Sequence, residues 1–261
     1  MAGPYARSRW APALACTALA ACALTACGDD PNEAGPPASP APSASTTSSP
    51  AKDTPAQETL VLRWRRTGGI AGLGGPGTVP EFSLYSTGRA IAASRDGLTE
   101  YRLKPDALRR LLDEARAAGL GRSHTVGSDR IADAIITVVT LGGATTRVIQ
   151  PESQAGPEAR FLTRLDPAGW AASDQSARPR PYEPGTTAVL AGESAVTGAA
   201  EKWPLEPLGD GDRVAGGICT LAPSGKVPAA EPGTAWRSGG KTYSVRLRPL
   251  LPGESSCKDL G

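Results

Sequence analysis

LKPDALRRLLDEARAAGL, residues 103–120, is the stretch around which we expect the fold to form. Pro105 suits the first position of a helix, because the N–H that it lacks would have no partner there. Asp106 and Arg116 complement the helix dipole at the two ends. Gly119 predicts the end of the helix, with Leu120 folding back on the last turn. Apolar residues recur at helical spacing and form one stripe: Leu108, Leu111, Leu112, Ala115 and Ala118.

Short runs on both sides of this helix predict antiparallel strands. Within them apolar and polar side chains alternate, as in a half-buried strand, and glycine-bearing turns separate neighbouring runs. The expected strands are residues 60–66, 81–85, 89–92, 98–103, 135–141 and 145–149, and a short helix is expected over residues 158–165. We therefore predict an α+β module over residues 59–170, an antiparallel sheet of hairpins packed by one main and one short helix.

The second half of the chain is predicted to be rich in strands. Residues 171–185 are polar and broken by proline, so they are predicted to form a connection. Beyond them, residues 186–190, 213–221 and 241–249 are typical of strands. The pattern thus predicts a β-rich C-terminal region over residues 186–261, and leaves open whether it folds alone or completes the first sheet.

The first 26 residues have the pattern of a secretory signal. Arg7 and Arg9 precede an apolar run, residues 11–24, which is shorter than the roughly 20 apolar residues of a membrane-spanning helix. The run ends in Leu24-Thr25-Ala26-Cys27, which resembles the lipobox of bacterial lipoproteins. The resemblance implies a diacylglyceryl group on Cys27 and a location on the outer face of the cytoplasmic membrane. The alternative is an ordinary signal peptide that contains cysteines.

The residues that follow Cys27 predict a disordered tether. Residues 27–58 are dominated by Pro, Ala, Ser and Thr and show no apolar period. A coil of about 30 residues spans on the order of 30 Å. We expect this segment to hold the folded part away from the membrane surface.

The chain has five cysteines, of which only two are expected in the folded part. Cys16 and Cys22 leave with the signal, and Cys27 takes the lipid. Cys219 and Cys257 then remain, and in an exported chain they are predicted to form a disulfide, the alternative being two free thiols.

The charge of the chain is balanced. It has 28 basic and 26 acidic side chains, and loss of the two arginines in the signal leaves 26 against 26. A chain without a concentrated basic face is not expected to bind nucleic acid. Nor is it expected to bind anionic lipid by charge, so the lipid on Cys27 is the predicted membrane contact.

The single histidine, His124, limits the chemistry that the chain can perform. Multi-histidine metal sites are disfavoured, and a Ser-His-Asp or Cys-His arrangement would depend on this one residue. We predict that His124 is a solvated loop residue, and we predict no catalytic residue, metal or cofactor. Residues 72–77 fit the Gly-x-Gly-x-x-Gly pattern, but a strand rather than a helix follows them, which argues against dinucleotide binding. They are expected to form a flexible connection, or a loop that enters a partner's cleft.

Paired acids and tryptophans have plain structural interpretations. The acid pairs are predicted to be surface charge rather than acid–base pairs or calcium ligands: Asp129 with Asp133, and Asp210 with Asp212. The tryptophans of the mature chain are predicted to lie in or near the core: Trp64, Trp170, Trp203 and Trp236. The alternative for the tryptophans is a stacking platform for cell-wall glycan.

The stretch Thr67-Gly68-Gly69-Ile70-Ala71-Gly72 resembles the start of emfourin-type domains, small inhibitors of thermolysin-like metalloproteases. The order of hairpins and helices expected over residues 60–165 is also similar to that of these domains. The resemblance implies an α+β fold and blockage of a protease cleft by loops of the module. The residues that it assigns to partner binding are Gly68, Gly69, Ile70, Ala71 and Gly72. Residues 74–77 enlarge the loop relative to the family, and residues 186–261 lie outside the comparison.

Three hypotheses follow for the function. The first is a non-enzymatic lipoprotein that binds a protein or a cell-envelope partner outside the membrane. The second is an inhibitor of a secreted thermolysin-like metalloprotease that acts through residues 68–77. The third is a hydrolase with an unusual site, which the single histidine disfavours. The sequence names neither the partner nor the oligomeric state.

Overall fold

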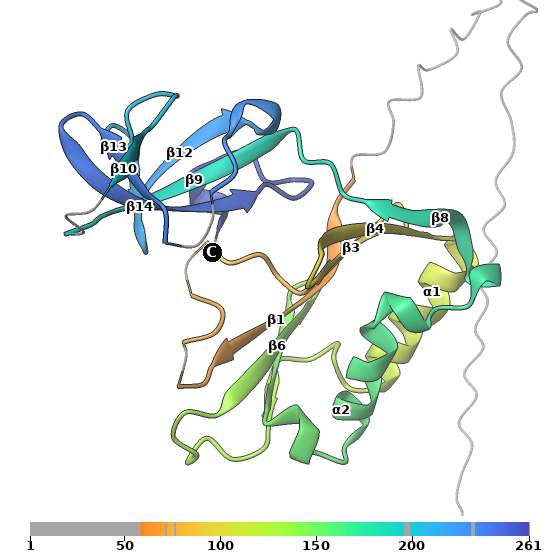
Figure 1. Cartoon of the computed structure of the whole chain (residues 1–261). Helices are drawn as coiled ribbons and strands as arrows, with labels where there is room; N and C mark the ends of the chain where they lie inside the picture. Colours follow the sequence, from red (N-terminus) through yellow and green to blue (C-terminus); the bar gives the residue numbers. More distant parts are fainter. Residues whose placement is uncertain (1–57, 71, 76, 196–198, 231–232, 261) are drawn as a thin grey trace, which may run out of the picture. The chain divides into compact units, whose positions relative to one another are not determined.

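The computed structural model describes residues 58–70, 72–75, 77–195, 199–230 and 233–260 (Figure 1). The chain divides between Lys52 and Asp53, and all described elements belong to the unit Asp53–Gly261. Within this part the chain forms two sheets of mostly antiparallel strands and two α-helices, which confirms the α+β class. The predicted signal, Cys27 and the tether up to residue 57 lie outside the described residues.

The first sheet has eight strands in the order β5-β7-β6-β1-β2-β3-β4-β8. Both predicted hairpins are present, β2 with β3 and β6 with β7. Strand β1 lies between these hairpins and joins them into one sheet, and only β5 and β7 run parallel. The bounds are β1 (Leu60–Gly68), β2 (Phe82–Tyr85), β3 (Arg89–Ser94), β4 (Gly97–Leu103), β5 (His124–Val126), β6 (Ile135–Leu141), β7 (Ala144–Ile149) and β8 (Gln175–Pro181).

Two helices cover one face of this sheet (Figure 1). They are α1 (Pro105–Ala117) and α2 (Pro157–Leu162), which the 3₁₀ turn Thr163–Leu165 extends. The alternation of β1 directs Leu62 into the core that Leu111 of α1 and Phe161 of α2 complete. Burial of this apolar surface is the main stabilising term for the module.

Helix α1 ends as the sequence predicts. Gly119 has a φ of +93°, in the left-handed region that disfavours a side chain. The N–H of Leu120 donates to the carbonyl of Ala115 over 3.1 Å, and the N–H of Gly119 donates to that of Arg116 over 3.0 Å. These are the two bonds of a Schellman motif. Leu120 is fully buried, so the turn fastens the end of the helix to the core.

The predicted connection over residues 171–185 is wrong in part, because Gln175–Pro181 forms the edge strand β8. This strand pairs antiparallel with β4. Almost all of its side chains are exposed, so it has no apolar alternation for a sequence pattern to detect. Two prolines are tolerated there because an edge strand needs its N–H groups on one side only. The first module therefore extends beyond residue 170.

The second sheet has six strands in the order β10-β13-β14-β9-β12-β11. Only β10 and β13 run parallel. The prediction of one strand over residues 213–221 is wrong, because the chain turns at Ala215 and Gly216 and forms the hairpin β11–β12. The bounds are β9 (Thr186–Glu193), β10 (Ala200–Lys202), β11 (Asp212–Val214), β12 (Gly217–Pro223), β13 (Ala235–Ser238) and β14 (Lys241–Pro249).

Alternating residues give the second sheet two apolar faces. Val189 and Ala222 belong to a cluster on one face, and Leu190 and Cys219 belong to a cluster on the other. The predicted disulfide is present, with the sulfurs of Cys219 and Cys257 2.05 Å apart. This bond fastens the C-terminal turn Cys257–Leu260 over the second face.

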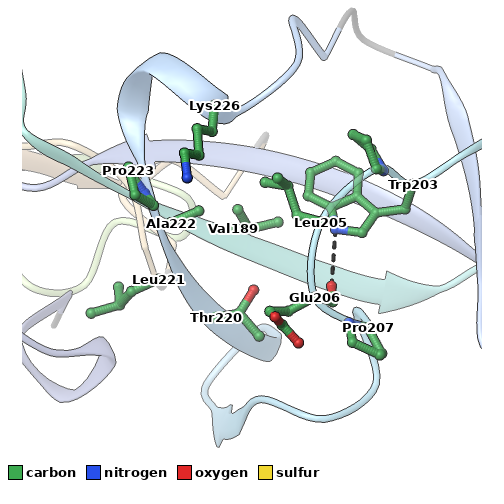
Figure 2. Close-up of a pocket in the computed structure, with 11 residues that line it drawn as sticks. Val189, Trp203, Leu205, Glu206, Pro207, Thr220, Leu221, Ala222, Pro223 and Lys226 are labelled. Carbon is green, nitrogen blue, oxygen red and sulfur yellow. Dashed lines mark hydrogen bonds between the residues drawn. The ribbon is translucent and has the colours of Figure 1, made fainter.

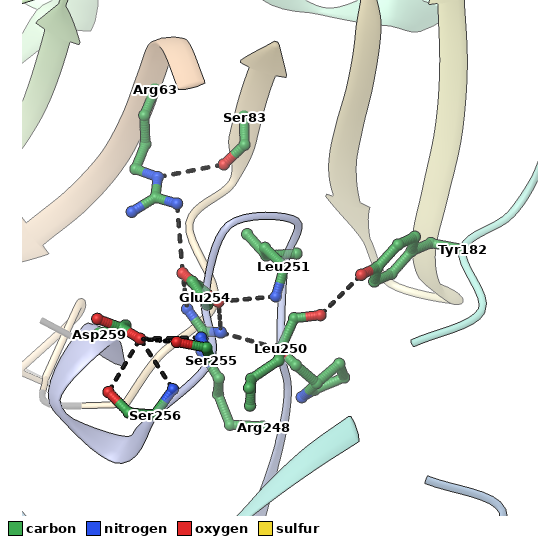
Figure 3. A network of polar contacts seen from close by, with 11 residues as sticks. Arg63, Ser83, Tyr182, Arg248, Leu250, Leu251, Glu254, Ser255, Ser256 and Asp259 are labelled. Atoms are coloured by element: carbon green, nitrogen blue, oxygen red, sulfur yellow. Dashed lines mark hydrogen bonds and ion pairs between the residues drawn. The ribbon is translucent and has the colours of Figure 1, made fainter. Parts of the chain in front are cut away.

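A buried polar network joins the two sheets (Figure 3). The Glu254 carboxylate accepts hydrogen bonds from Arg248 over 2.9 Å, from Arg63 of β1 over 3.3 Å and from the N–H of Leu251 over 2.7 Å. Nearby, the hydroxyl of Tyr182 donates to the carbonyl of Leu250 over 2.7 Å. The C-terminal region therefore forms its own sheet. The Glu254 carboxylate links this sheet to the first one, because it binds both Arg248 and Arg63.

Candidate functional site

The loop between β1 and β2 is fixed at its base. The N–H of Leu73 donates to the carbonyl of Gly68 over 2.8 Å, and the N–H of Gly69 donates to that of Ala134 over 3.2 Å. Gly74 has a φ of +67°, and a Cβ added there would lie 2.1 Å from the carbonyl oxygen of Arg66. Only glycine fits such a position. The base of the loop is a tight turn with backbone hydrogen bonds, and the predicted flexibility of residues 72–77 stays a prediction.

Ile70 projects from this turn into solvent. It is 93% exposed, more than any other large apolar side chain in the described ranges. Full burial of an isoleucine side chain stabilises a fold by about 1.5–3 kcal/mol, and an exposed isoleucine does not provide this stabilisation. Scaffolds commonly carry binding residues on loops of this kind. Gly68, Gly69, Ile70 and Gly72 of the predicted partner-binding set lie together here, whereas Ala71 lies outside the described residues.

The far end of the loop is buried against the second sheet. A Cβ on Gly77 would lie 2.2 Å from Cδ1 of Leu190, a residue of β9. The loop is therefore held at both ends, by backbone bonds at residues 68–74 and by close packing at residue 77.

A hollow of about 480 Å³ lies on one face of the second sheet (Figure 2). Val189 and Ala222 line it, and Lys226 is its cation. Nε1 of Trp203 donates to the carbonyl of Glu206 over 3.1 Å, which fixes the loop that borders the hollow. The sequence did not predict this hollow, and its only sequence signal is the pair of prolines, Pro204 and Pro207, that follow Trp203.

The tryptophans lie where the core prediction places them. Trp203 and Trp236 are buried and pack edge to face, with ring centroids 5.1 Å apart. Trp170 is half-buried and packs edge to face against Phe82 at 5.9 Å, and Trp64 packs against the same core. The burial of Trp203 and Trp236 gives no support to a glycan-stacking platform formed by these two rings.

His124 lies in strand β5 rather than in a solvated loop, so that prediction is wrong. Its Nε2 is 3.0 Å from Oε1 of Glu158, and its Nδ1 is 2.9 Å from the carbonyl oxygen of Arg122. Both neighbouring oxygens are acceptors, so the geometry favours the doubly protonated ring. The Arg122 carbonyl and then the Glu158 carboxylate raise the pKa of His124 above its usual 6.5. Each ring nitrogen of His124 thus lies within hydrogen-bond distance of an oxygen atom of the protein.

We expect this ion pair to give a measurable pH dependence of stability. Because the folded-state pKa of His124 is raised, the pair stabilises the fold fully below pH 6.5, and this contribution is lost as the pH rises through the folded pKa. The effect is small because the ring is half-exposed. NMR titration of the His124 imidazole is expected to give a pKa above 6.5, and Glu158→Gln is expected to lower it. An unshifted imidazole pKa in the native protein would contradict the pairing.

The two acid pairs lie on the exposed surface of the described part of the chain. The described ranges contain no group of three or more His, Cys, Asp and Glu side chains that could hold a metal ion. Asp129 and Asp133 are exposed, as predicted. Asp210 and Asp212 line a second hollow, described below. Among the described helices, none is long and apolar enough to cross a membrane.

No protein-family model, curated protein or solved structure matches the chain. The candidate functional sites are therefore the loop with Ile70 and the hollows of the second sheet. The similarity to emfourin-type domains remains a hypothesis for the first module.

Proposed function

We propose that the chain is a non-enzymatic lipoprotein, anchored through Cys27 to the outer face of the cytoplasmic membrane, that binds a protein or another envelope component. The lipobox supports the anchor, and the balanced charge leaves the acyl chains as the membrane contact. Each buried methylene contributes about 0.8 kcal/mol, and two acyl chains hold a protein on a bilayer where one does not.

The observation that carries the binding function is Ile70 on the fixed loop of residues 68–77. Because backbone bonds close the base of this turn, we expect Ile70 to lose little conformational freedom when a partner covers it. The exposed isoleucine Ile131 offers a matched comparison, because it also lies outside the strands and helices and is 41% exposed. Of these two isoleucines, only Ile70 has a side chain that is almost fully exposed to solvent.

A second candidate function is inhibition of a thermolysin-like metalloprotease. The exposed apolar side chains of Ile70 and Leu73 on one loop support it, because a loop of this kind can enter a cleft. The test is titration of the fragment Asp53–Gly261 into a thermolysin-like protease assay. Loss of turnover that Ile70→Ala reverses is expected from an inhibitor. Unchanged turnover at micromolar fragment would remove this candidate and leave the envelope partner in place.

We expect Ile70→Ala to weaken binding to the envelope about tenfold or more, since a central apolar anchor contributes upwards of about 1.4 kcal/mol. The measurement is sedimentation of the labelled fragment Asp53–Gly261 with isolated envelopes of the source organism. Ile131→Ala is the matched control and is expected to bind like the parent fragment. Equal retention of the Ile70→Ala and parent fragments would contradict the assignment of the loop.

A further inference from the structure

The second sheet has an unpaired edge. Strand β12 pairs with β9 over residues 218–223, whereas β11 covers only residues 217–219 on its other side. Within the described ranges, no strand lies beside residues 220–223 on that outer side. Pro223 has no N–H to leave unpaired there, as is common on edges. An edge of this kind is a template for another extended segment.

The open edge presents the backbone groups of Leu221. A Cβ on Gly211 would lie 2.2 Å from the carbonyl oxygen of Cys219, so that carbonyl points toward β11. Alternate residues of a strand direct their N–H and C=O to the same side. Those of Leu221 therefore point past the end of β11, and within the described ranges the pairing of β11 with β12 stops at Cys219. Leu221 is also one of the exposed large apolar residues.

A hollow lies on each face of this edge. The hollow beside Trp203 occupies the face of Val189 and Ala222 (Figure 2). A second hollow, of about 450 Å³, occupies the face of Cys219. Thr220 and Leu221 of the edge line both hollows. Side chains of an added strand alternate between the two faces, so successive residues would enter the two hollows in turn.

The two hollows differ in charge. The first is lined mainly by apolar side chains, and its two charged residues, Lys226 and Glu206, are of opposite sign. The carboxylates of Glu206, Asp210 and Asp212 line the second, and none of them pairs with a cation in the described part of the chain. The second hollow is therefore complementary to a basic side chain.

We propose that an extended peptide adds as a strand to β12 at Leu221, placing an apolar side chain in the hollow beside Trp203 and the adjacent basic side chain against Asp210 and Asp212. Hydrogen bonds to the backbone of the edge supply the affinity for the peptide. The two hollows determine which side chains of the peptide are accepted, as in other cases of strand addition. This site lies on the second sheet, requires no contact with Ile70, and goes beyond the proposed envelope binding.

The first test uses fluorescent octapeptides of alternating residues with the fragment Asp53–Gly261. The valine–lysine peptide is expected to bind at least about tenfold more tightly than the valine–glutamate peptide. Asp210→Asn with Asp212→Asn is expected to weaken valine–lysine binding about tenfold. The control variant Asp129→Asn with Asp133→Asn removes two exposed carboxylates elsewhere and is expected to leave binding unchanged.

The second test separates strand addition from plain charge attraction. Hydrogen exchange of the Leu221 amide is expected to slow at least about tenfold in the complex, and a peptide N-methylated at alternate positions on its edge-facing side is expected not to bind. Absence of valine–lysine binding up to about 1 mM, equal binding of the N-methylated peptide, or equal effects of the two aspartate variants would overturn the proposal. Because Ile70→Ala is expected to leave peptide binding intact, failure here is distinguishable from failure of the envelope function.

Discussion

Replacement of Glu254 by glutamine is expected to lower the free energy of unfolding by about 3–5 kcal/mol. The Glu254 side chain is 6% exposed and that of Arg248 is 2% exposed. The glutamine would retain the volume of the side chain but would leave the charge of Arg248 buried without a counter-charge. It would also weaken the contact to Arg63 that joins the two sheets.

Two variants serve as controls for this substitution. The hydroxyl of Tyr85 is buried without a well-oriented hydrogen bond in the described part of the chain, and burial raises its pKa to about 12 although nearby Arg63 acts to lower it. Tyr85→Phe is therefore expected to be nearly neutral. Glu193→Gln breaks an exposed pair with Lys241 and is expected to leave the stability almost unchanged, because solvent screens the pair. The measurement is urea unfolding of each variant. If Glu254→Gln lowers the free energy of unfolding by less than about 1 kcal/mol, the claim that this buried network links the two sheets is contradicted.

Removal of the disulfide is expected to cost about 4 kcal/mol. Cys219 and Cys257 are 38 residues apart, and opening this loop increases the conformational entropy of the unfolded chain. Both cysteines are buried, so the bond also fastens the C-terminal turn over the second face of the sheet.

The measurement is urea unfolding of the parent fragment with and without reductant. Cys219→Ala with Cys257→Ala is the control, because reductant is expected to have no further effect on it. Equal stability of the oxidised and reduced parent fragments would show that the crosslink does not constrain the unfolded chain as described.

Local signals account for the parts of the fold that the sequence predicted. The Pro105 start, the apolar stripe and the Gly119 end of α1 lie within one stretch and agree with one another. The hairpins β2–β3 and β6–β7 combine alternation with glycine-bearing or polar turns. Strand β8 lacked any such signal, because both its faces are polar and its place is set by pairing with β4.

The candidate sites were predictable only in part. The glycines of residues 68–77 predicted a loop, but not the close approach of Gly74 to the Arg66 carbonyl or the contact of Gly77 with Leu190. The latter contact joins residues more than a hundred positions apart in the sequence. The hollows beside β12 arise because β11 is short and the loop at Trp203 folds back, and no periodic pattern encodes either feature.

Display outside the cytoplasmic membrane is the claim on which the envelope-binding proposal depends. Mass spectrometry of the full chain purified from cells of its source tests it most directly. We predict a mature polypeptide that begins at Cys27 and carries the mass of a diacylglyceryl group on that residue. An intact N-terminus, or a Cys27 without added hydrocarbon, would contradict the account.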